Sequence, residues 1–300
     1  MSNRILARLF QLIYDHYEGM FNMQLSFGQE TPCVANIRAE GVGTISRYVW
    51  YSELYPHVTC LLGPGKRNVL ENQPADHLHH HGVCFSHGVV NDHLDFYLYR
   101  EKRNLGKINV IGDVRMESHE NVATLSHDSE WVTAEGKTLM TDTRSYRWEA
   151  FENGELYLDT AITLQTIDTT VTLHPTNESG MPLVRPADWL VANHGGILSD
   201  SEGRRGEKEM FGKPARWIDE TAETNGQLIG LAILDHPSNP VPAHWFARDY
   251  GPLSPNYNYF TGPIELKTGN QLALKYRIFV HQGHGNTDRL DEEYDKFSIS

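Results

Sequence analysis

Polar and apolar residues alternate along most of this 300-residue chain, and this alternation limits the possible folds more than any other feature of the sequence. In the stretch ELYLDTAITLQ at residues 155–165 the apolar residues fall on every second position, and QLALKYRIFV at residues 271–280 repeats the pattern. A period of two is typical of strands with one buried face. The dipeptides Asn153-Gly154 and Asn225-Gly226 favour tight hairpins beside such stretches. The sequence therefore predicts paired antiparallel strands.

Helical periodicity is confined to the two ends of the chain. Helical stretches of about 10 to 15 residues do not alternate with strands, as a parallel sheet would require. We therefore expect an all-β fold, a large antiparallel two-sheet β-sandwich with more than about ten strands between Tyr48 and Val280. The expected organisation is a helical extension and lead-in at residues 1–44, one sandwich domain at 45–283 and a short helical tail at 284–300.

The charge balance disfavours nucleic acid as a partner. The chain has 26 Lys and Arg residues against 39 Asp and Glu residues, and a formal charge of −13 repels a phosphate backbone. The sequence contains no phosphate-binding loop, dinucleotide-binding fingerprint or nucleophile elbow, so it gives no support to ATP, NAD or acyl-enzyme chemistry.

Cellular context is also bounded by the sequence. Charged residues interrupt the apolar N-terminal stretch, so nothing approaches the roughly 20 apolar residues that cross a bilayer. The three cysteines are widely spaced, which favours reduced, buried thiols over disulfides or a zinc ribbon. We expect a soluble, cytoplasmic protein with no membrane partner, and the sequence leaves its oligomeric state open.

The octapeptide ADHLHHHG at residues 75–82 contains four histidines and one aspartate. If this segment is extended, His77, His79 and His81 project to one side, and three imidazoles on one face could bind a divalent metal. Alternatively, His79 and His80 could act as acid and base near neutral pH beside the aspartate. The third interpretation is a hydrated polar edge without chemistry. We expect His79 and His80 to be functional, with no cofactor required and a divalent metal as the alternative.

Three further polar clusters interrupt apolar segments: HPTNESGMPLVR, SDSEGRRGE and LAILDHPSNPVPAHWFARDYG. Active-site groups often stand where a core strand gives way to a loop, although the run PSNP is also a strong turn former. Burying each cluster separately would require a separate set of hydrogen-bond partners. We therefore expect them to line one concave site with the histidine segment. The candidate catalytic residues are His79, His80, His236, Glu178, Glu202 and Asp235.

The ordered motifs DHLHHHGVCFSHGVVNDHLDFY, NESGMPLVR, SEGRRGE…GKPARWID, AILDHPSNP…WFARDYG and LALKYRIFVHQG together resemble a bacterial PmoA-like family of unknown function, commonly labelled methane oxygenase PmoA. The resemblance runs from about Tyr48 to Gly283. Members read DHxHHRG in the first motif, so His81 stands where an arginine would bind an anion or orient a group. Because this chain has no membrane-spanning stretch, the label does not describe a membrane oxygenase subunit.

The resemblance implies a β-supersandwich similar to the galactose-mutarotase-like proteins and a role in sugar catabolism. In such folds a histidine and a carboxylate flank a sugar ring, where one donates a proton to an oxygen and the other accepts a proton from a second oxygen. The resemblance further implies that several residues stack on the sugar or bind its hydroxyls: Asp76, Arg185, Asn239, Trp245, Arg248 and Tyr250.

The expected function is that of a carbohydrate-active enzyme, an epimerase, lyase or hydrolase, which acts on a sugar or oxidised (keto) sugar by His–carboxylate acid–base chemistry. The expected partner is a small-molecule carbohydrate. One alternative is a non-catalytic sugar-binding protein. The other is a metal-dependent oxygenase or hydrolase centred on the His77–His81 cluster.

Overall fold

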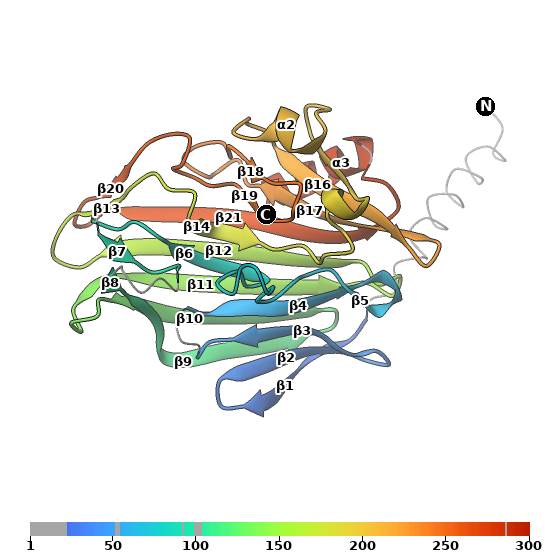
Figure 1. The fold of residues 1–300 in the computed structure, drawn as a ribbon. Helices are drawn as coiled ribbons and strands as arrows, with labels where there is room; N and C mark the ends of the chain where they lie inside the picture. Colours follow the sequence, from blue (N-terminus) through green and yellow to red (C-terminus); the bar gives the residue numbers. More distant parts are fainter. Residues whose placement is uncertain (1–22, 52–54, 92, 99–103, 286) are drawn as a thin grey trace, which may run out of the picture.

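The fold is a sandwich of two large antiparallel sheets (Figure 1). The computed structural model describes residues 23–300 except 52–54, 92, 99–103 and 286. One apolar core draws residues from both sheets and fills the space between them. The predictions of an all-β two-sheet sandwich and of its large number of strands are confirmed.

The first sheet has nine strands in the order β1-β2-β3-β4-β6-β14-β19-β18, with β5 paired to β4. Its strands are β1 (Leu25–Thr31), β2 (Val34–Ala39), β3 (Gly43–Val49), β4 (His57–Gly63), β5 (Arg67–Asn68), β6 (Val83–His87), β14 (Ser179–Val184), β18 (Phe246–Ala247) and β19 (Leu253–Ser254).

The second sheet has eight strands in the order β15-β16-β17-β21-β12-β11-β10-β9. Its strands are β9 (Lys107–His119), β10 (Val122–Val132), β11 (Thr138–Ala150), β12 (Leu156–Thr166), β15 (Ile197–Asp200), β16 (Trp217–Thr224), β17 (Gln227–Asp235) and β21 (Gln271–Gln282).

The remaining elements are short pairs of strands and short helices. The pairs are β13 (Val171–Leu173) with β20 (Ile264–Leu266), and β7 (Leu94–Asp95) with β8 (Asn104–Leu105). The helices are η1 (Pro64–Lys66), η2 (Ala192–His194), α2 (Gly206–Met210) and α3 (Thr287–Ser298).

The two stretches with the clearest alternation form the central strands β12 and β21 of the second sheet. They pair in register, with Leu158 opposite Ile278, and their inward side chains are buried. The hairpins expected at Asn153-Gly154 and Asn225-Gly226 connect β11 to β12 and β16 to β17. Positive φ angles at both glycines explain why these dipeptides suit the turns.

The N-terminal boundary of the sandwich needs correction. Residues 25–39, which the sequence assigned to a lead-in, form β1 and β2 at the edge of the nine-stranded sheet. Most side chains of β1 are exposed or half-buried, so its hydrophobic pattern is too weak to reveal a strand. The sandwich therefore begins at Leu25 rather than at residue 45. Residues 1–22, where a helix was expected, lie outside the described residues.

Helix α3 packs on the outer face of the eight-stranded sheet, away from the main core. Leu290 and Phe297 of the helix join a second apolar cluster with Tyr157 of β12 and Phe279 of β21. The hydroxyl of Tyr157 also donates a hydrogen bond of 2.5 Å to Glu293. This cover explains why outward-facing positions of β12 and β21 carry aromatic rings.

Strand β11 carries a fully buried ion pair on its core side. The side chains of Asp142 and Arg144 are both 0% exposed, and two hydrogen bonds of 3.0 and 2.8 Å join them. Trp131 donates a third hydrogen bond to Asp142 at 2.7 Å. Burial alone would raise the pKa of Asp142, but the adjacent guanidinium outweighs it and holds this pKa below its usual value. The carboxylate is therefore charged inside the sandwich.

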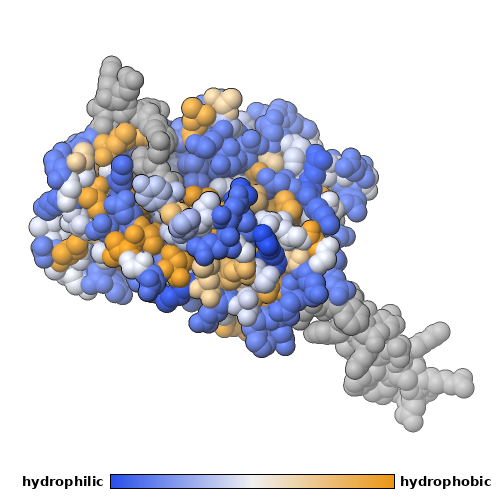
Figure 2. All heavy atoms as spheres, turned by 90° about the horizontal axis from the view of Figure 1, so that it is seen from below, coloured by the Kyte–Doolittle hydropathy of each residue, from blue (hydrophilic) through white to orange (hydrophobic). Residues whose placement is uncertain are grey.

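Within the described residues, no helix is both long and apolar enough to cross a bilayer. Figure 2 shows apolar patches that hydrophilic side chains interrupt on the face it presents. The three cysteines are free, as expected, but only Cys84 is buried, while Cys33 and Cys60 are half-buried.

Candidate functional site

The histidine segment is a compact loop rather than an extended strand. The amide of His77 donates to the carbonyl of Pro74, the amide of His80 donates to that of His77, and the amide of Gln73 donates to that of His80. These turns begin at a proline, which favours a change of chain direction. The condition under which His77, His79 and His81 would project to one side, an extended segment, is therefore not met.

The loop instead places the rings of His77, His79 and His80 in contact with one another. The ring of His77 lies 5.5 Å from that of Tyr250 and 4.6 Å from that of His80, both in stacked geometry. The ring of His79 meets His80 edge-on at 4.5 Å and Tyr97 edge-on at 5.2 Å. Successive ring contacts therefore connect Tyr250, His77, His80 and His79, and this series is called the row of rings.

At the end of this row, His79 faces Glu178. The Nε2 atom of His79 and the Oε2 atom of Glu178 are 4.0 Å apart, and the side chains are 16% and 18% exposed. This separation exceeds a direct hydrogen bond, so one hydroxyl group of a ligand could contact both. The histidine and the carboxylate can therefore reach the same ligand from two directions.

The first sheet positions Glu178 directly. This residue precedes β14, and its carbonyl accepts a hydrogen bond of 2.8 Å from the amide of Gly88, which follows β6. A Cβ atom at position 88 would collide with that carbonyl, so only glycine permits the approach. The pairing of β6 with β14 thus brings two segments separated by some ninety positions to one place.

Arg185 and Tyr250 lie at the other end of the row of rings. They line a pocket of about 610 Å³, together with Asp76, Asp188 and His194. Arg185 is only 3% exposed, and its Nη1 atom donates to the carbonyl of Tyr250 at 2.5 Å. Its buried Nε atom has no hydrogen-bond partner among the described residues. This N–H is therefore a donor that a ligand could satisfy.

Arg248 also contacts Tyr250 but is already paired. The guanidinium groups of Arg185 and Arg248 each lie 5.6 Å from the ring centre of Tyr250. Arg248 forms an ion pair with Glu207 of α2 at 3.3 Å. Of the two arginines, Arg185 is thus the better candidate for contact with a ligand.

Several imidazoles near the site are held neutral. Burial, followed by the neighbouring imidazoles of His79 and His77, lowers the pKa of His80 to about 2. Burial, followed by His57, lowers the pKa of His81 to about 2, and burial lowers that of His57 to about 4. At neutral pH these groups therefore contribute no charge beside Arg185.

These lowered pKa values predict a loss of stability in acid. Below about pH 6.5 these histidines bind protons in the unfolded chain but stay neutral in the folded one. The free energy of unfolding is therefore highest above that pH and decreases as the pH falls. The loss amounts to about 1.4 kcal/mol per pH unit for each such histidine. We expect His81→Gln to reduce the steepness of the loss by about this amount between about pH 6 and 4.

Urea unfolding at a series of pH values measures this slope. Glutamine keeps a donor for Asn72, which contacts Nδ1 of His81 at 3.0 Å. The matched control is His119→Gln, because the His119 side chain is 87% exposed and should leave the slope unchanged. If the free energy of unfolding changed equally steeply with pH in the wild type and in His81→Gln, His81 would not be held neutral in the folded protein.

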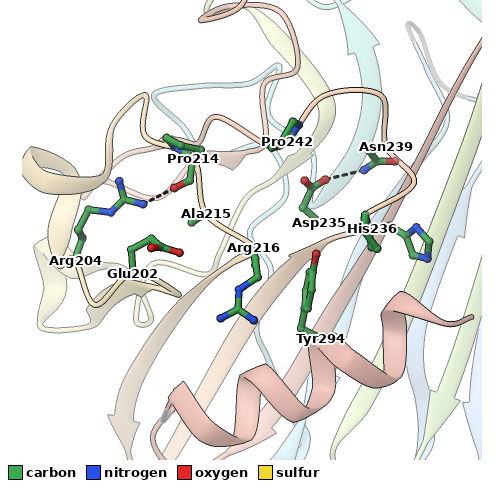
Figure 3. A pocket seen from close by; sticks show the side chains of 11 residues that line it. Glu202, Arg204, Pro214, Ala215, Arg216, Asp235, His236, Asn239, Pro242 and Tyr294 are labelled. Atoms are coloured by element: carbon green, nitrogen blue, oxygen red, sulfur yellow. Dashed lines mark hydrogen bonds between the residues drawn. The ribbon is translucent and has the colours of Figure 1, made fainter.

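A second group of expected residues lines a different pocket, of about 620 Å³ (Figure 3). Glu202, Asp235, His236 and Asn239 belong to it, and it shares no lining residue with the pocket at Arg185. Asp235 ends β17 of the eight-stranded sheet, whereas Glu178 precedes β14 of the nine-stranded sheet. The prediction that all four polar motifs line one site is therefore wrong.

Two of these residues, Asn239 and His236, have structural contacts within the turn that follows β17. Asn239 donates to Asp235 at 2.7 Å and bonds the backbone of Lys275 through both its amide nitrogen and its oxygen. His236 bonds Ser238 at 2.7 Å and packs edge-on against Phe297. Both side chains thus hold a turn, which is the alternative that the run PSNP suggested.

Trp245 cannot stack on a sugar in this structure. Its ring is 0% exposed, and its Nε1 atom donates to the carbonyl of Ala215 at 2.9 Å. It belongs to the main core, so its expected role in substrate binding is wrong. The sequence cannot distinguish a buried tryptophan from a ligand-facing one when both stand beside polar residues.

Tyr97, Tyr294 and Glu220 are residues of interest that the sequence did not reveal. Tyr97 contacts His79, and Tyr294 of α3 lines the second pocket. Glu220 is 0% exposed and accepts a hydrogen bond from Ala192 at 2.8 Å. Its only signal in the sequence is that Asp219 and Glu220 place two adjacent carboxylates inside strand β16, where both are buried.

The proposed metal ligands do not gather around one point. No group of three or more His, Cys, Asp or Glu side chains suited to a metal ion occurs in the described part of the chain. The ring of His81 stacks on His57 at 3.8 Å and bonds Asn72. The residues present therefore do not fit a three-histidine centre, and a divalent metal stays a prediction for metal analysis.

Comparisons with known proteins add a family and weak likenesses in fold. A family model described as "Family of unknown function (DUF6807)" matches residues 37–295. A GalM/aldose epimerase homologue from C. elegans is 9% identical, with 87% of this chain and 100% of that chain covered and a TM-score of 0.34. A putative aldose 1-epimerase from Escherichia coli K12 is 13% identical over the same shares, also with a TM-score of 0.34.

Two further matches cover small parts of larger proteins. A polysaccharide lyase is 12% identical, with 91% of this chain and 35% of that chain covered and a TM-score of 0.32. A stretch of 130 residues is 29% identical to the DNA-directed RNA polymerase subunit beta' of Lactobacillus helveticus (strain DPC 4571) and covers 38% of this chain. The match spans 10% of that subunit's length.

Proposed function

The chain belongs to the DUF6807 family of unknown function, and we propose that this member is a carbohydrate-active enzyme whose acid–base pair is His79 and Glu178. The substrate is a sugar or an oxidised (keto) sugar, and the reaction is an epimerisation, an elimination or a hydrolysis. The observation that carries this proposal is the 4.0 Å separation between His79 Nε2 and Glu178 Oε2, with both side chains partly exposed.

The pair can move protons at two oxygens of one bound sugar. One group accepts a proton from a hydroxyl, and the other donates a proton to a second oxygen, so the site has the same total charge before and after. A separation of 4.0 Å allows each group its own hydrogen bond to the ligand. This transfer is that of an anomeric epimerisation. In a hydrolysis the base instead takes its proton from a water molecule, and in an elimination it takes the proton from the carbon next to a carbonyl group. In both of these reactions the acid protonates the oxygen that leaves.

Neighbouring groups support the pair without sharing its role. His80 is neutral and lies between His77 and His79, so it fixes their rings and adds no competing charge. Arg185 lines the pocket next to Tyr250, and its buried Nε atom has no partner among the described residues. Asp76 lies beside His77, with its carboxylate 3.0 Å from Nδ1 of that histidine.

The wider assignments belong to the same proposal. They are a place in sugar catabolism, a small-molecule carbohydrate partner, a cytoplasmic location and membership of the PmoA-like proteins. The acidic balance of the chain supports a neutral ligand over a polyphosphate.

Proton exchange in heavy water tests the proposal before the substrate is known. The protein is incubated in D2O with a panel of aldoses, ketoses, uronic acids and keto sugars, and NMR follows anomer interconversion, deuterium entry at carbon and product formation. We expect one class to react with the wild type and not with the His79→Ala/Glu178→Gln double variant. Saturable binding without any reaction would instead make the protein a sugar-binding module.

The same panel separates a metal enzyme from a metal-independent one. Protein purified without an affinity tag is dialysed against a strong chelator and assayed again, alongside elemental analysis. We expect turnover to persist. Loss of turnover that zinc, iron or manganese restores would overturn the metal-independent version.

A further inference from the structure

We propose that the pocket between the end of β17, residues 214–216 and α3 is a second ligand site, separate from His79 and Glu178, and that it binds a neutral polyol such as a saccharide unit. Its volume of about 620 Å³ is sufficient for one sugar ring. Side chains from four separate parts of the chain, at residues 202–204, 214–216, 235–242 and 294, surround one hollow (Figure 3). This inference is independent of whether the first site is catalytic.

Donors, acceptors and apolar walls alternate around this pocket. Asp235 and Glu202 present carboxylates, and Arg216 presents a guanidinium group (Figure 3). The apolar walls come from the ring of Tyr294 and from the residues Pro214, Ala215, Pro237 and Pro242. A hydroxyl both donates and accepts, and the carbons of a polyol pack on apolar surface, so this lining suits a polyol.

The charges around the pocket disfavour an anionic ligand. Arg216 is paired with Asp291 at 2.9 Å, and Arg204 is paired with Asp200 at 2.7 Å, so neither guanidinium is left to balance a phosphate or carboxylate. Glu202 and Asp235 form no ion pair with the described residues. An anion would therefore meet two carboxylates without a compensating cation.

The position of Asp235 is fixed before any ligand arrives. Its two oxygens accept hydrogen bonds of 2.7 Å from Asn239 and 2.8 Å from the amide of Ala243. Each carboxylate oxygen can accept a further bond, so a ligand hydroxyl can bind without displacing these donors. Burial raises the pKa of Asp235 to about 6, and the carboxylate is thus mostly charged at neutral pH.

Helix α3 supplies one wall of the pocket, and hydrogen bonds from Arg216 and Trp217 hold this helix in place. Asp291 of this helix accepts hydrogen bonds from Arg216 at 3.0 Å and from Trp217 at 2.7 Å. The guanidinium of Arg216 lies 5.4 Å from the ring centre of Tyr294. The wall is therefore anchored to β16, which makes the pocket preformed.

Saturation-transfer NMR with D-glucose, D-galactose, D-mannose and D-xylose tests the site. We expect at least one of these sugars to bind saturably to the His79→Ala/Glu178→Gln variant, in which the first site is disabled. Glu202→Ala and Tyr294→Ala, made in that background, should each weaken this binding by about fivefold or more, because each removes a ligand contact worth about 1 kcal/mol. Lys208→Ala is the surface control and should bind as its parent does.

The outcomes distinguish this inference from the proposed function. Absence of saturable binding to the double variant for all four sugars would overturn the second site, whatever the result at His79. Unchanged affinity in both pocket variants would overturn it as well. D-glucosamine and D-glucuronate test the ligand class: markedly tighter binding of either charged sugar would contradict the assignment to a neutral polyol.

Discussion

Replacing His79 by alanine lowers turnover of the sugar substrate by about 10²–10⁴-fold, the usual contribution of one positioned acid or base. Glu178→Gln has an effect of the same order, because glutamine keeps the shape of the side chain but can neither accept nor donate the proton. Since the two proton transfers belong to one reaction step, the double variant loses little more than the worse single variant. Initial rates on the substrate found by the NMR panel measure all three effects.

The matched control for this experiment is Leu78→Ala. Leu78 stands next to His79 in the same loop, but its side chain is 60% exposed and it takes no part in the row of rings. It should turn over at the wild-type rate, and circular dichroism should show the same fold for every variant. Wild-type turnover in both His79→Ala and Glu178→Gln would defeat the acid–base assignment.

Replacing Asp142 by alanine lowers the free energy of unfolding by about 3–5 kcal/mol. The change leaves the guanidinium of Arg144 charged, fully buried and without the partner that offsets its lost hydration. It also removes the acceptor of the indole N–H of Trp131. Urea unfolding at neutral pH measures the loss, and the expected result is a clear shift of the midpoint to lower urea.

Asp128→Ala is the control for this prediction. Asp128 lies on β10 and pairs with Arg115 at 3.4 Å, but the two side chains are 44% and 53% exposed. An exposed pair of this kind contributes about 0–1 kcal/mol, since water screens both charges. If Asp142→Ala costs no more than Asp128→Ala, the ion pair inside the sandwich does not stabilise the fold in the way we describe.

The sequence predicts those parts of the fold that local pattern decides. The alternation in β12 and β21 arises because these central strands have one face in the main core, and the hairpin dipeptides set their neighbours. Edge strand β1 escapes prediction because few of its side chains are buried, so burial imposes no pattern on it. The local pattern of polar and apolar residues therefore predicts the densely packed central strands but not the edge strands.

The sequence predicted only some of the residues that lie together at the candidate site. His79 and Glu178 were both expected to act, and they do lie together, but Glu202 and Asp235 belong to another pocket. Which polar motifs meet depends on strand order in the two sheets, and sequence spacing does not determine that order. Tyr294 was missed because its place in a pocket depends on where α3 packs.

The close approach of Gly88 to Glu178 makes position 88 informative about the proposed pair in other members of the family. A side chain at position 88 would push the carbonyl of Glu178 away, and the carboxylate would move from His79 with it. Evolution can therefore lose the acid–base pair without touching either member of it. Relatives that retain glycine here together with both partners are the ones in which to look for the same chemistry. Relatives with a larger residue at this position could keep the sandwich and have given up the reaction.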